Sequence, residues 1–304
     1  MTTKARLVVF AYHEVGYRCL EWLLAHGETV RAVFTHEDRP DENVWFRSVA
    51  ALARAHGVPV LTPATLKDAA IMAAIAAYEP DILYSFYYRH MIPEAIRRLA
   101  ARGAFNMHGS LLPAYRGRVP INWAIIHGQS ETGATLHHMV ARADAGDIVD
   151  QERVAIGPED RARDVLLKVA DAAVTVLARA HPMIVAGCAP RRVQDETQAS
   201  TYGARRPEDG RIDWRASAAS IFNLVRALTD PYPGAFSEVA GERFLIWWGR
   251  PVAWPEGVEP GRVVSVAPLI VATGKGGFRI DRWEWARKGL YGHHGFSVGE
   301  KVGP

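Results

Sequence analysis

The strongest constraint on the fold is the regular alternation of short apolar runs with helical segments through the first third of the chain. "RLVVFAY" (6–12) is a nearly continuous apolar run, which is typical of a strand buried on both faces of a sheet. Strands that alternate with helices favour a parallel sheet with helices on both faces. We expect strands at 6–12, 30–36, 58–63, 81–88 and 103–109, and helices at 14–26, 44–56, 66–78 and 93–100.

The pattern changes in the second half of the chain. A polar stretch rich in charged residues separates a long helical segment from strand–turn–strand patterns such as "GRVVSVAP". The further elements expected are helices at 120–127, 160–186 and 217–229 and strands at 133–140 and 147–156. The predicted domains are an α/β, Rossmann-like parallel-sheet domain (1–188), a linker (189–212) and a small OB-like β-barrel domain (213–304).

Composition and charge indicate an ordinary globular protein. The chain of 304 residues has 49% hydrophobic and 23% charged residues, and its net charge is +3. Residues 1–200 contain 22 Lys and Arg against 22 Asp and Glu, so they lack the dense basic face of a nucleic-acid-binding protein. No apolar stretch reaches the length needed to span a bilayer. We therefore expect no nucleic-acid partner and no membrane insertion.

The cysteines and the N-terminal residues indicate the cellular compartment of the protein. Cys19 and Cys188 are the only cysteines, which excludes a disulfide framework and fits a reducing compartment. The first apolar run is interrupted by His13 and Glu14 and is too short for a signal peptide. The expected location is the cytoplasm.

Asn106 and His108 stand two residues apart at the end of the fifth expected strand, in "AFNMHGSLLPAYRGRVPINW". Residues two apart on a strand point to the same face, and ligands gather at the carboxyl ends of strands in such sheets. The same edge would carry His13, His36 and residues 87–90. An amide donor beside an imidazole could stabilise an oxyanion and move a proton at one carbonyl carbon. From these two residues alone, a hydrogen-bonded pair that closes the strand is an equally good interpretation.

A third polar residue, Asp144, lies in the turn "ARADAG" between the two strands expected after residue 130. A carboxylate beside an imidazolium raises the pKa of the histidine and keeps it a proton carrier near neutral pH. Taken alone, Asp144 is more simply an ordinary turn residue. Its combination with Asn106 and His108 favours the catalytic interpretation.

Other patterns argue against other chemistries. The segment "VFAYHEVG" has no glycine-rich dinucleotide fingerprint, so no NAD cofactor is expected. The pairs His137–His138 and His293–His294 could suggest metal binding, but neighbouring strand residues point to opposite faces and no further ligands stand at suitable spacing. We therefore expect no metal. Ser110 lies in no nucleophile-elbow pattern, which argues against a serine hydrolase.

Two segments, "FNMHGSLLPAYRG" and "ETGATLHHMVARADAGDI", are together similar to the signature of the folate-dependent formyltransferases. That family combines an Asn-x-His strand, a Ser-Leu-Leu-Pro loop and a downstream Asp-x-Gly turn. Within the family, "VVFAYHEVG", "AVFTHEDRPDENVWFRSVAALA" and "SFYYRHMI" resemble the formyltransferase domain of the ArnA type. The resemblance implies formylation of UDP-4-amino-4-deoxy-L-arabinose with 10-formyltetrahydrofolate, a step of the lipid A modification that gives polymyxin resistance.

The resemblance also implies roles for individual residues. Asn106 would stabilise the oxyanion and His108 would move the proton, while Asp144 would set the pKa and orientation of His108. The implied folate-binding residues are His90, Met91, Ile92, Arg118, Val140, Ala141, Arg142 and Ala143. A nucleotide-linked amino sugar is the implied partner, and a homodimer and a separate decarboxylase are further expectations. Arg205 and Arg206 could contact the diphosphate, but solvated linker charges are the favoured interpretation.

Several alternatives remain open at this point. The acceptor could be another nucleotide-linked amino sugar or initiator methionyl-tRNA, and a formyltetrahydrofolate hydrolase would share the same three residues. A non-catalytic sugar-nucleotide-binding protein is disfavoured by the intact Asn–His–Asp set. The ArnA type in its familiar form continues into an NAD-dependent decarboxylase, whereas this sequence has no second Rossmann pattern. Either a stand-alone formyltransferase with a separately encoded decarboxylase or an enzyme for a related amino sugar is expected.

Overall fold

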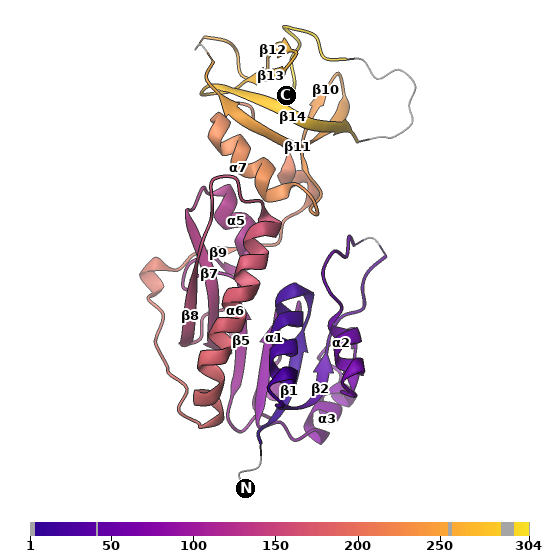
Figure 1. Cartoon of the computed structure of the whole chain (residues 1–304), viewed down its shortest axis with the longest axis vertical. Coiled ribbons are helices and arrows are strands. Elements are labelled where there is room, and N and C mark those ends of the chain that lie inside the picture. The colour runs from indigo at the N-terminus through magenta and orange to yellow at the C-terminus, as the bar shows by residue number, and fades with distance from the viewer. Residues whose placement is uncertain (1–3, 41, 255–256, 287–294, 304) are drawn as a thin grey trace. The chain divides into compact units, whose positions relative to one another are not determined.

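A computed structural model describes residues 4–40, 42–254, 257–286 and 295–303 (Figure 1). The chain forms two compact units, each assembled from separate segments. The first unit comprises Met1–Pro120, Glu131–Ala155 and Val165–Gly203, and the second comprises Ile121–Ser130, Ile156–Asp164 and Ala204–Pro304. His293 and His294, considered above as metal ligands, lie outside the described residues.

The first unit is built on a seven-stranded sheet with the order β3-β2-β1-β4-β5-β7-β8. The strands β3, β2, β1, β4 and β5 run parallel, which confirms the predicted parallel sheet. The last two strands instead pair antiparallel, β7 with β5 and β8 with β7, and so extend the sheet beyond the parallel part. The bounds are β1 Arg6–Ala11, β2 Thr29–Phe34, β3 Val60–Leu61, β4 Ile82–Phe86, β5 Ala104–His108, β7 Glu131–His138 and β8 Ile148–Ala155.

Helices cover both faces of this sheet. On one face, Val8 and Phe10 of β1 belong to one buried cluster with Ile75 of α3 and Ile96 of α4. On the other face α1 and α6 lie side by side (Figure 1), joined by an ion pair between Arg18 and Asp171. The helices are α1 His13–Ala25, α2 Val49–Ala55, α3 Ala69–Ala77, α4 Glu94–Arg97 and α6 Ala162–Val185.

Helix α2 begins later than the sequence pattern predicts. The apolar pattern indicated a helix from residue 44, but the helix starts at Val49. The Ser48 side chain accepts a hydrogen bond from the Ala51 N–H at 3.2 Å, which caps the helix at this point. The connection between β2 and α2 therefore runs from residue 35 to residue 48 without a helix or strand among its described residues, which is long for a strand-to-helix connection.

The second unit contains an antiparallel five-stranded sheet with the order β10-β11-β14-β13-β12. The turns between β10 and β11 and between β12 and β13 agree with the predicted strand–turn–strand pattern. The order is not a simple meander, because β14 lies between β11 and β13. The bounds are α5 Pro120–Ile126, α7 Ala218–Leu228, β10 Ala235–Val239, β11 Glu242–Val252, β12 Val263–Val266, β13 Leu269–Ala272 and β14 Gly277–Trp285.

The segment predicted as a linker, 189–212, is more ordered than that interpretation implies. Its residues up to Gly203 belong to the first unit. There β9 (Thr201–Tyr202) pairs parallel with β6 (Arg116–Gly117), a short strand in the loop that follows β5. This part of the segment is therefore tied to the loop that carries the Ser-Leu-Leu-Pro sequence. Across the described chain, no helix combines the length and the apolar character that crossing a membrane would require.

Candidate active site

The carboxyl ends of the parallel strands bring the predicted catalytic residues to one edge of the first unit. Asn106 and His108 both lie on β5, two residues apart, and so share a face of the sheet. His108 is the last residue of the strand and is only 7% exposed. His13 and His36 follow β1 and β2 at the same edge, because these strands run parallel to β5.

Asp144 reaches these two side chains from the turn after β7. Its Oδ1 lies 3.6 Å from His108 Nδ1 and accepts a hydrogen bond from Asn106 Nδ2 at 3.3 Å. Its Oδ2 accepts from the Gly117 N–H at 2.9 Å. The turn is tight: Asp144 has a φ of 54°, and a Cβ at Gly146 would lie 1.8 Å from the carbonyl oxygen of His138. The glycine of the Asp-x-Gly sequence is thus required by this backbone.

The loop after β5 fixes the orientation of His108. The Nε2–H of His108 donates to the Tyr115 carbonyl oxygen at 2.7 Å, so Nδ1 is the ring nitrogen that faces Asp144. Tyr115 itself has a φ of 60°, which directs its carbonyl toward the ring. Ser110 donates to the Ala114 carbonyl at 2.6 Å and closes the loop, a structural role that agrees with its exclusion as a nucleophile.

The Asp144 carboxyl is held in its charged form. Burial by itself would raise its pKa, but the charge of His108, the contact with His137 and the Gly117 N–H lower it by more. The net result is a pKa well below the ordinary value for aspartate. A permanent carboxylate therefore stands beside His108 at neutral pH.

His137 belongs to the same cluster, although the sequence patterns suggested it only as a weak metal candidate. It pairs with Asn106 across the β5–β7 ladder. Its Nδ1–H donates to the His138 carbonyl at 2.9 Å, and its Nε2 lies 3.1 Å from Asn106 Nδ2 and 3.4 Å from Asp144 Oδ1. His138 points away, with Nε2 bonded to the Pro190 carbonyl. No group of three or more potential metal-binding side chains occurs among the described residues.

The residues predicted to bind folate lie in three loops of the first unit. Met91 is 59% exposed and Val140 is 40% exposed, whereas Ile92 is buried in the hydrophobic core and can offer only its main chain. Arg118 is exposed and donates to the Arg89 carbonyl at 3.3 Å, so it lies beside the segment that holds His90 to Ile92. The residues Ala141, Arg142 and Ala143 are exposed in the turn before Asp144.

Comparison with known proteins assigns the family. The formyl transferase family matches residues 21–181, and the formyl transferase C-terminal domain matches residues 205–296. The chain belongs to the formyl transferase family. In keeping with this family, it has a Rossmann-like first domain and a separate β-rich second domain.

Three solved structures illustrate the shared fold. HypX from Aquifex aeolicus in complex with tetrahydrofolic acid is 20% identical over 94% of this chain and 45% of that chain, with a TM-score of 0.65. The chain thus spans about half the length of HypX. An N-formyltransferase from Helicobacter canadensis, in complex with folinic acid and dTDP-3-aminofucose, is 17% identical over 93% and 100%, with a TM-score of 0.68. A likely sugar N-formyltransferase from Mycobacterium tuberculosis is 22% identical over 84% and 100%, with a TM-score of 0.63.

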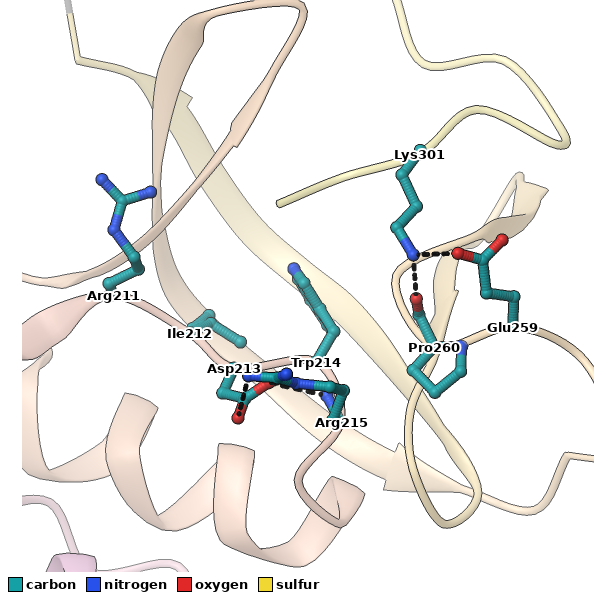
Figure 2. Close-up of a pocket in the computed structure, with 8 residues that line it drawn as sticks. All are labelled: Arg211, Ile212, Asp213, Trp214, Arg215, Glu259, Pro260 and Lys301. Carbon is teal, nitrogen blue, oxygen red and sulfur yellow. Dashed lines mark hydrogen bonds and ion pairs between the residues drawn. The ribbon is translucent and has the colours of Figure 1, made fainter. Parts of the chain in front are cut away.

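The second unit of this formyl transferase contains a pocket of about 470 Å³, shown in Figure 2. Its charged lining residues pair with one another or with close neighbours: Lys301 with Glu259, Arg215 with Asp213, and Arg211 with Glu238 outside the pocket. It contains no counterpart of the Asn–His–Asp cluster among its described lining residues. The candidate active site is therefore the cluster on β5 in the first unit.

The two arginines considered for the diphosphate differ in environment. Arg205 lies over the Trp123 ring at 4.7 Å and donates to the Asp209 carbonyl at 2.6 Å, so it is not the solvated charge that the linker interpretation implied. Desolvation lowers the pKa of its guanidinium. Arg206 is exposed and agrees with that interpretation.

Proposed function

We propose that this chain transfers the formyl group of 10-formyltetrahydrofolate to the amine of a nucleotide-linked amino sugar. The observation that carries the proposal is the convergence of Asn106, His108 and Asp144 at one strand end in a member of the formyl transferase family. The nucleotide sugar in the Helicobacter canadensis structure supports the acceptor class. The tetrahydrofolic acid in the HypX structure supports the donor class.

In the proposed reaction the neutral amine attacks the formyl carbon, so a C–N bond forms and the formyl oxygen gains negative charge. Asn106 would donate an amide N–H to that oxygen, a contribution commonly worth about 10²–10³ in rate. The bond to the folate nitrogen then breaks, and the proton lost by the amine passes through His108 to that nitrogen. His108 would use Nδ1, because its Nε2–H is bonded to the Tyr115 carbonyl.

Asp144 would contribute to this reaction by charge and by position. Its carboxylate stabilises the imidazolium that forms when His108 takes the proton. Its bond from Asn106 holds the amide at the end of the strand until the formyl oxygen takes over one N–H. Because the carboxylate is paired with donors, it is not itself a proton acceptor in this scheme.

The folate is proposed to bind against residues 90–92 and 140–143, with Arg118 beside them. Most of these residues are exposed, and the main-chain donors and acceptors of such loops can bond to a flat pterin edge. The exposed guanidinium of Arg118 can pair with a carboxylate of the folate. This arrangement would place the formyl carbon near Asn106 and His108.

The proposed acceptor is UDP-4-amino-4-deoxy-L-arabinose, which places the enzyme in lipid A modification and polymyxin resistance. The support is the resemblance of three segments to the ArnA type, among them "SFYYRHMI" (85–92). We further propose that the enzyme is cytoplasmic and forms a homodimer, and that the decarboxylase of the same pathway is a separate chain. The predicted domain boundaries, with a catalytic domain at 1–188, a linker at 189–212 and a C-terminal domain at 213–304, also remain a prediction.

An acceptor panel tests this proposal. Purified protein would receive 10-formyltetrahydrofolate with UDP-4-amino-4-deoxy-L-arabinose, other nucleotide-linked amino sugars, charged initiator tRNA, or no acceptor. We expect tetrahydrofolate to appear with one amino sugar and a formylated product of matching mass to form. Release without an acceptor would indicate a hydrolase, and turnover with the tRNA alone would contradict an amino-sugar acceptor.

A further inference from the structure

Gln194 is a buried polar residue that joins the two loops of the active site. It lies in the segment predicted as a linker, but it is only 6% exposed. Its Nε2 donates to the main-chain carbonyls of Asp144 at 2.8 Å and Gly146 at 2.7 Å. Its Oε1 accepts from Nε and Nη2 of Arg116 at 3.1 Å and 2.7 Å. A glutamine amide has two donors and two acceptor lone pairs, so all four are used.

The donor side of Gln194 holds the turn that carries Asp144. This turn has a left-handed residue at Asp144 and a glycine at 146 that no larger residue can replace without a clash. Left-handed backbone at a non-glycine residue costs free energy and persists only where the surroundings hold it. The two bonds from Nε2 join the carbonyls on both sides of Ala145 and therefore fix the turn.

The acceptor side of Gln194 holds the loop that follows β5. Arg116 is a fully buried arginine, 1% exposed, and its charge is paired with Glu196 at 2.7 Å. The next residue, Gly117, donates its N–H to Asp144 Oδ2. A Cβ at Gly117 would lie 2.3 Å from the Tyr202 carbonyl, so β9 presses against the loop at this residue. The carboxylate of Asp144 is thus bonded to Gly117 of the Arg116 loop, and its main-chain carbonyl is bonded to Gln194, which also accepts from Arg116.

We propose that Gln194 is a positioning residue for formyl transfer, which acts through Asp144 by holding the Asp144 turn and the Arg116 loop in register. The inference rests on the proposed function for its kinetic consequence, but its geometric consequence can be measured in the free protein. Residues that orient a reacting group through hydrogen bonds influence rate strongly, since a displacement of about 1 Å can cost roughly a hundredfold.

An amide is required at this position because the side chain must donate to the Asp144 and Gly146 carbonyls and also accept from Arg116. Glutamate keeps an acceptor for Arg116 but cannot donate to the Asp144 and Gly146 carbonyls. Methionine has a similar length and offers neither group. The pair of variants Gln194→Glu and Gln194→Met therefore separates simple anchoring of Arg116 from positioning of Asp144.

The first measurement is steady-state kinetics with the acceptor that the wild type uses. We expect kcat to fall about tenfold to a hundredfold in both Gln194→Met and Gln194→Glu, with KM for the acceptor nearly unchanged. Gln198→Met is the matched control, because Gln198 is an exposed glutamine of the same segment that bonds only to Asp195 in the described structure. Circular dichroism and thermal unfolding would establish that each variant is folded.

The second measurement follows the Asp144 carboxyl carbon by NMR in protein labelled at aspartate, with Asp144→Asn for assignment. Asp144 is faced by His108 from β5, His137 from β7 and the Gly117 N–H from the loop. When the turn is released, these groups no longer hold the carboxylate, so its titration should move to higher pH in Gln194→Met. A structural change far from Asp144 would not move this signal.

The two measurements distinguish the possible failures. If the wild type transfers no formyl group to any acceptor, the proposed function fails, while the NMR titration still decides the role of Gln194. A wild-type kcat in Gln194→Met, an unmoved Asp144 titration, or full activity in Gln194→Glu would each contradict the inference.

Discussion

His108 with Asp144 and His181 with Glu28 are both histidine–carboxylate pairs of the first unit, and the difference between these pairs shows what makes an active site. In one pair, His108 Nδ1 lies 3.6 Å from Asp144. In the other, His181 Nε2 lies 3.4 Å from Glu28, and Nδ1 shares a 2.8 Å hydrogen bond with the Tyr84 hydroxyl. Residue types, distances and burial are similar in the two pairs.

Their places in the fold are opposite. His108 ends β5 at the carboxyl edge of the parallel strands, where ligands bind in such sheets. Glu28 stands just before β2, at the amino edge, and His181 lies on α6. Burial lowers the pKa of His181 despite the neighbouring carboxylate, so this ring is a neutral structural group. A histidine beside a carboxylate therefore indicates catalysis only at the edge where donors converge.

The largest expected effect is a difference in kcat between variants of His108 and His181. His108→Ala should lower kcat about 10²–10⁴-fold, because it removes the group that moves the proton. His181→Gln should keep the transfer rate within about threefold, since it lies outside the ligand edge of the sheet. Tetrahydrofolate formation at saturating acceptor measures both. Equal losses in the two variants would contradict the distinction.

The next effect concerns the carboxylate of the catalytic pair. Asp144→Asn should slow transfer at neutral pH, because it removes the charge that stabilises the His108 imidazolium. The pKa of Asp144 is lowered in the folded protein, so its carboxylate stabilises the fold above about pH 4 and this contribution is lost as pH falls toward the lowered pKa. Urea unfolding should therefore show that the stability difference between wild type and Asp144→Asn shrinks below pH 4. A difference that grows toward low pH would contradict the assigned direction.

The smallest effect tests the structural pair by stability alone. His181→Leu leaves the buried Tyr84 hydroxyl without its partner and should lower the free energy of unfolding by about 1–3 kcal/mol. The pKa of His181 is lowered by burial from 6.5, so the wild type loses stability as pH falls below that value, because the unfolded chain binds the proton more readily. The variant should lose less between pH 7 and pH 5. His13 and His36, whose pKa values burial lowers to about 4, contribute equally to both proteins and cancel in this comparison.

Much of the fold could be predicted because it follows from local patterns. Apolar runs predicted the parallel strands, since a strand buried on both faces has few polar positions. The antiparallel β7 and β8 and the position of β14 between β11 and β13 could not be predicted, because pairing partners are set by contacts between distant segments. Helix α2 was predicted too long because the cap at Ser48 competes with an apolar pattern that continues before it.

The site shows the same division. Asn106 and His108 were predicted to share a face from their spacing alone, and the sequence suggested Asp144 only in combination with them. His137 was missed because its place opposite Asn106 depends on the register of β5 and β7. Gln194 was missed because a polar, charged segment has no pattern that reports what it contacts.

The amino-acid sequence alone determined that a parallel sheet forms, because apolar runs alternate with helical segments. It also determined that an amide and an imidazole meet at the carboxyl edge of that sheet, because side chains two residues apart on a strand share a face. Tertiary structure alone decided which second histidine joins them, and that a glutamine from residues 189–203 ties the two loops together. The physical reason is that hydrogen bonds between residues far apart in the chain depend on register and loop geometry, which no local pattern specifies.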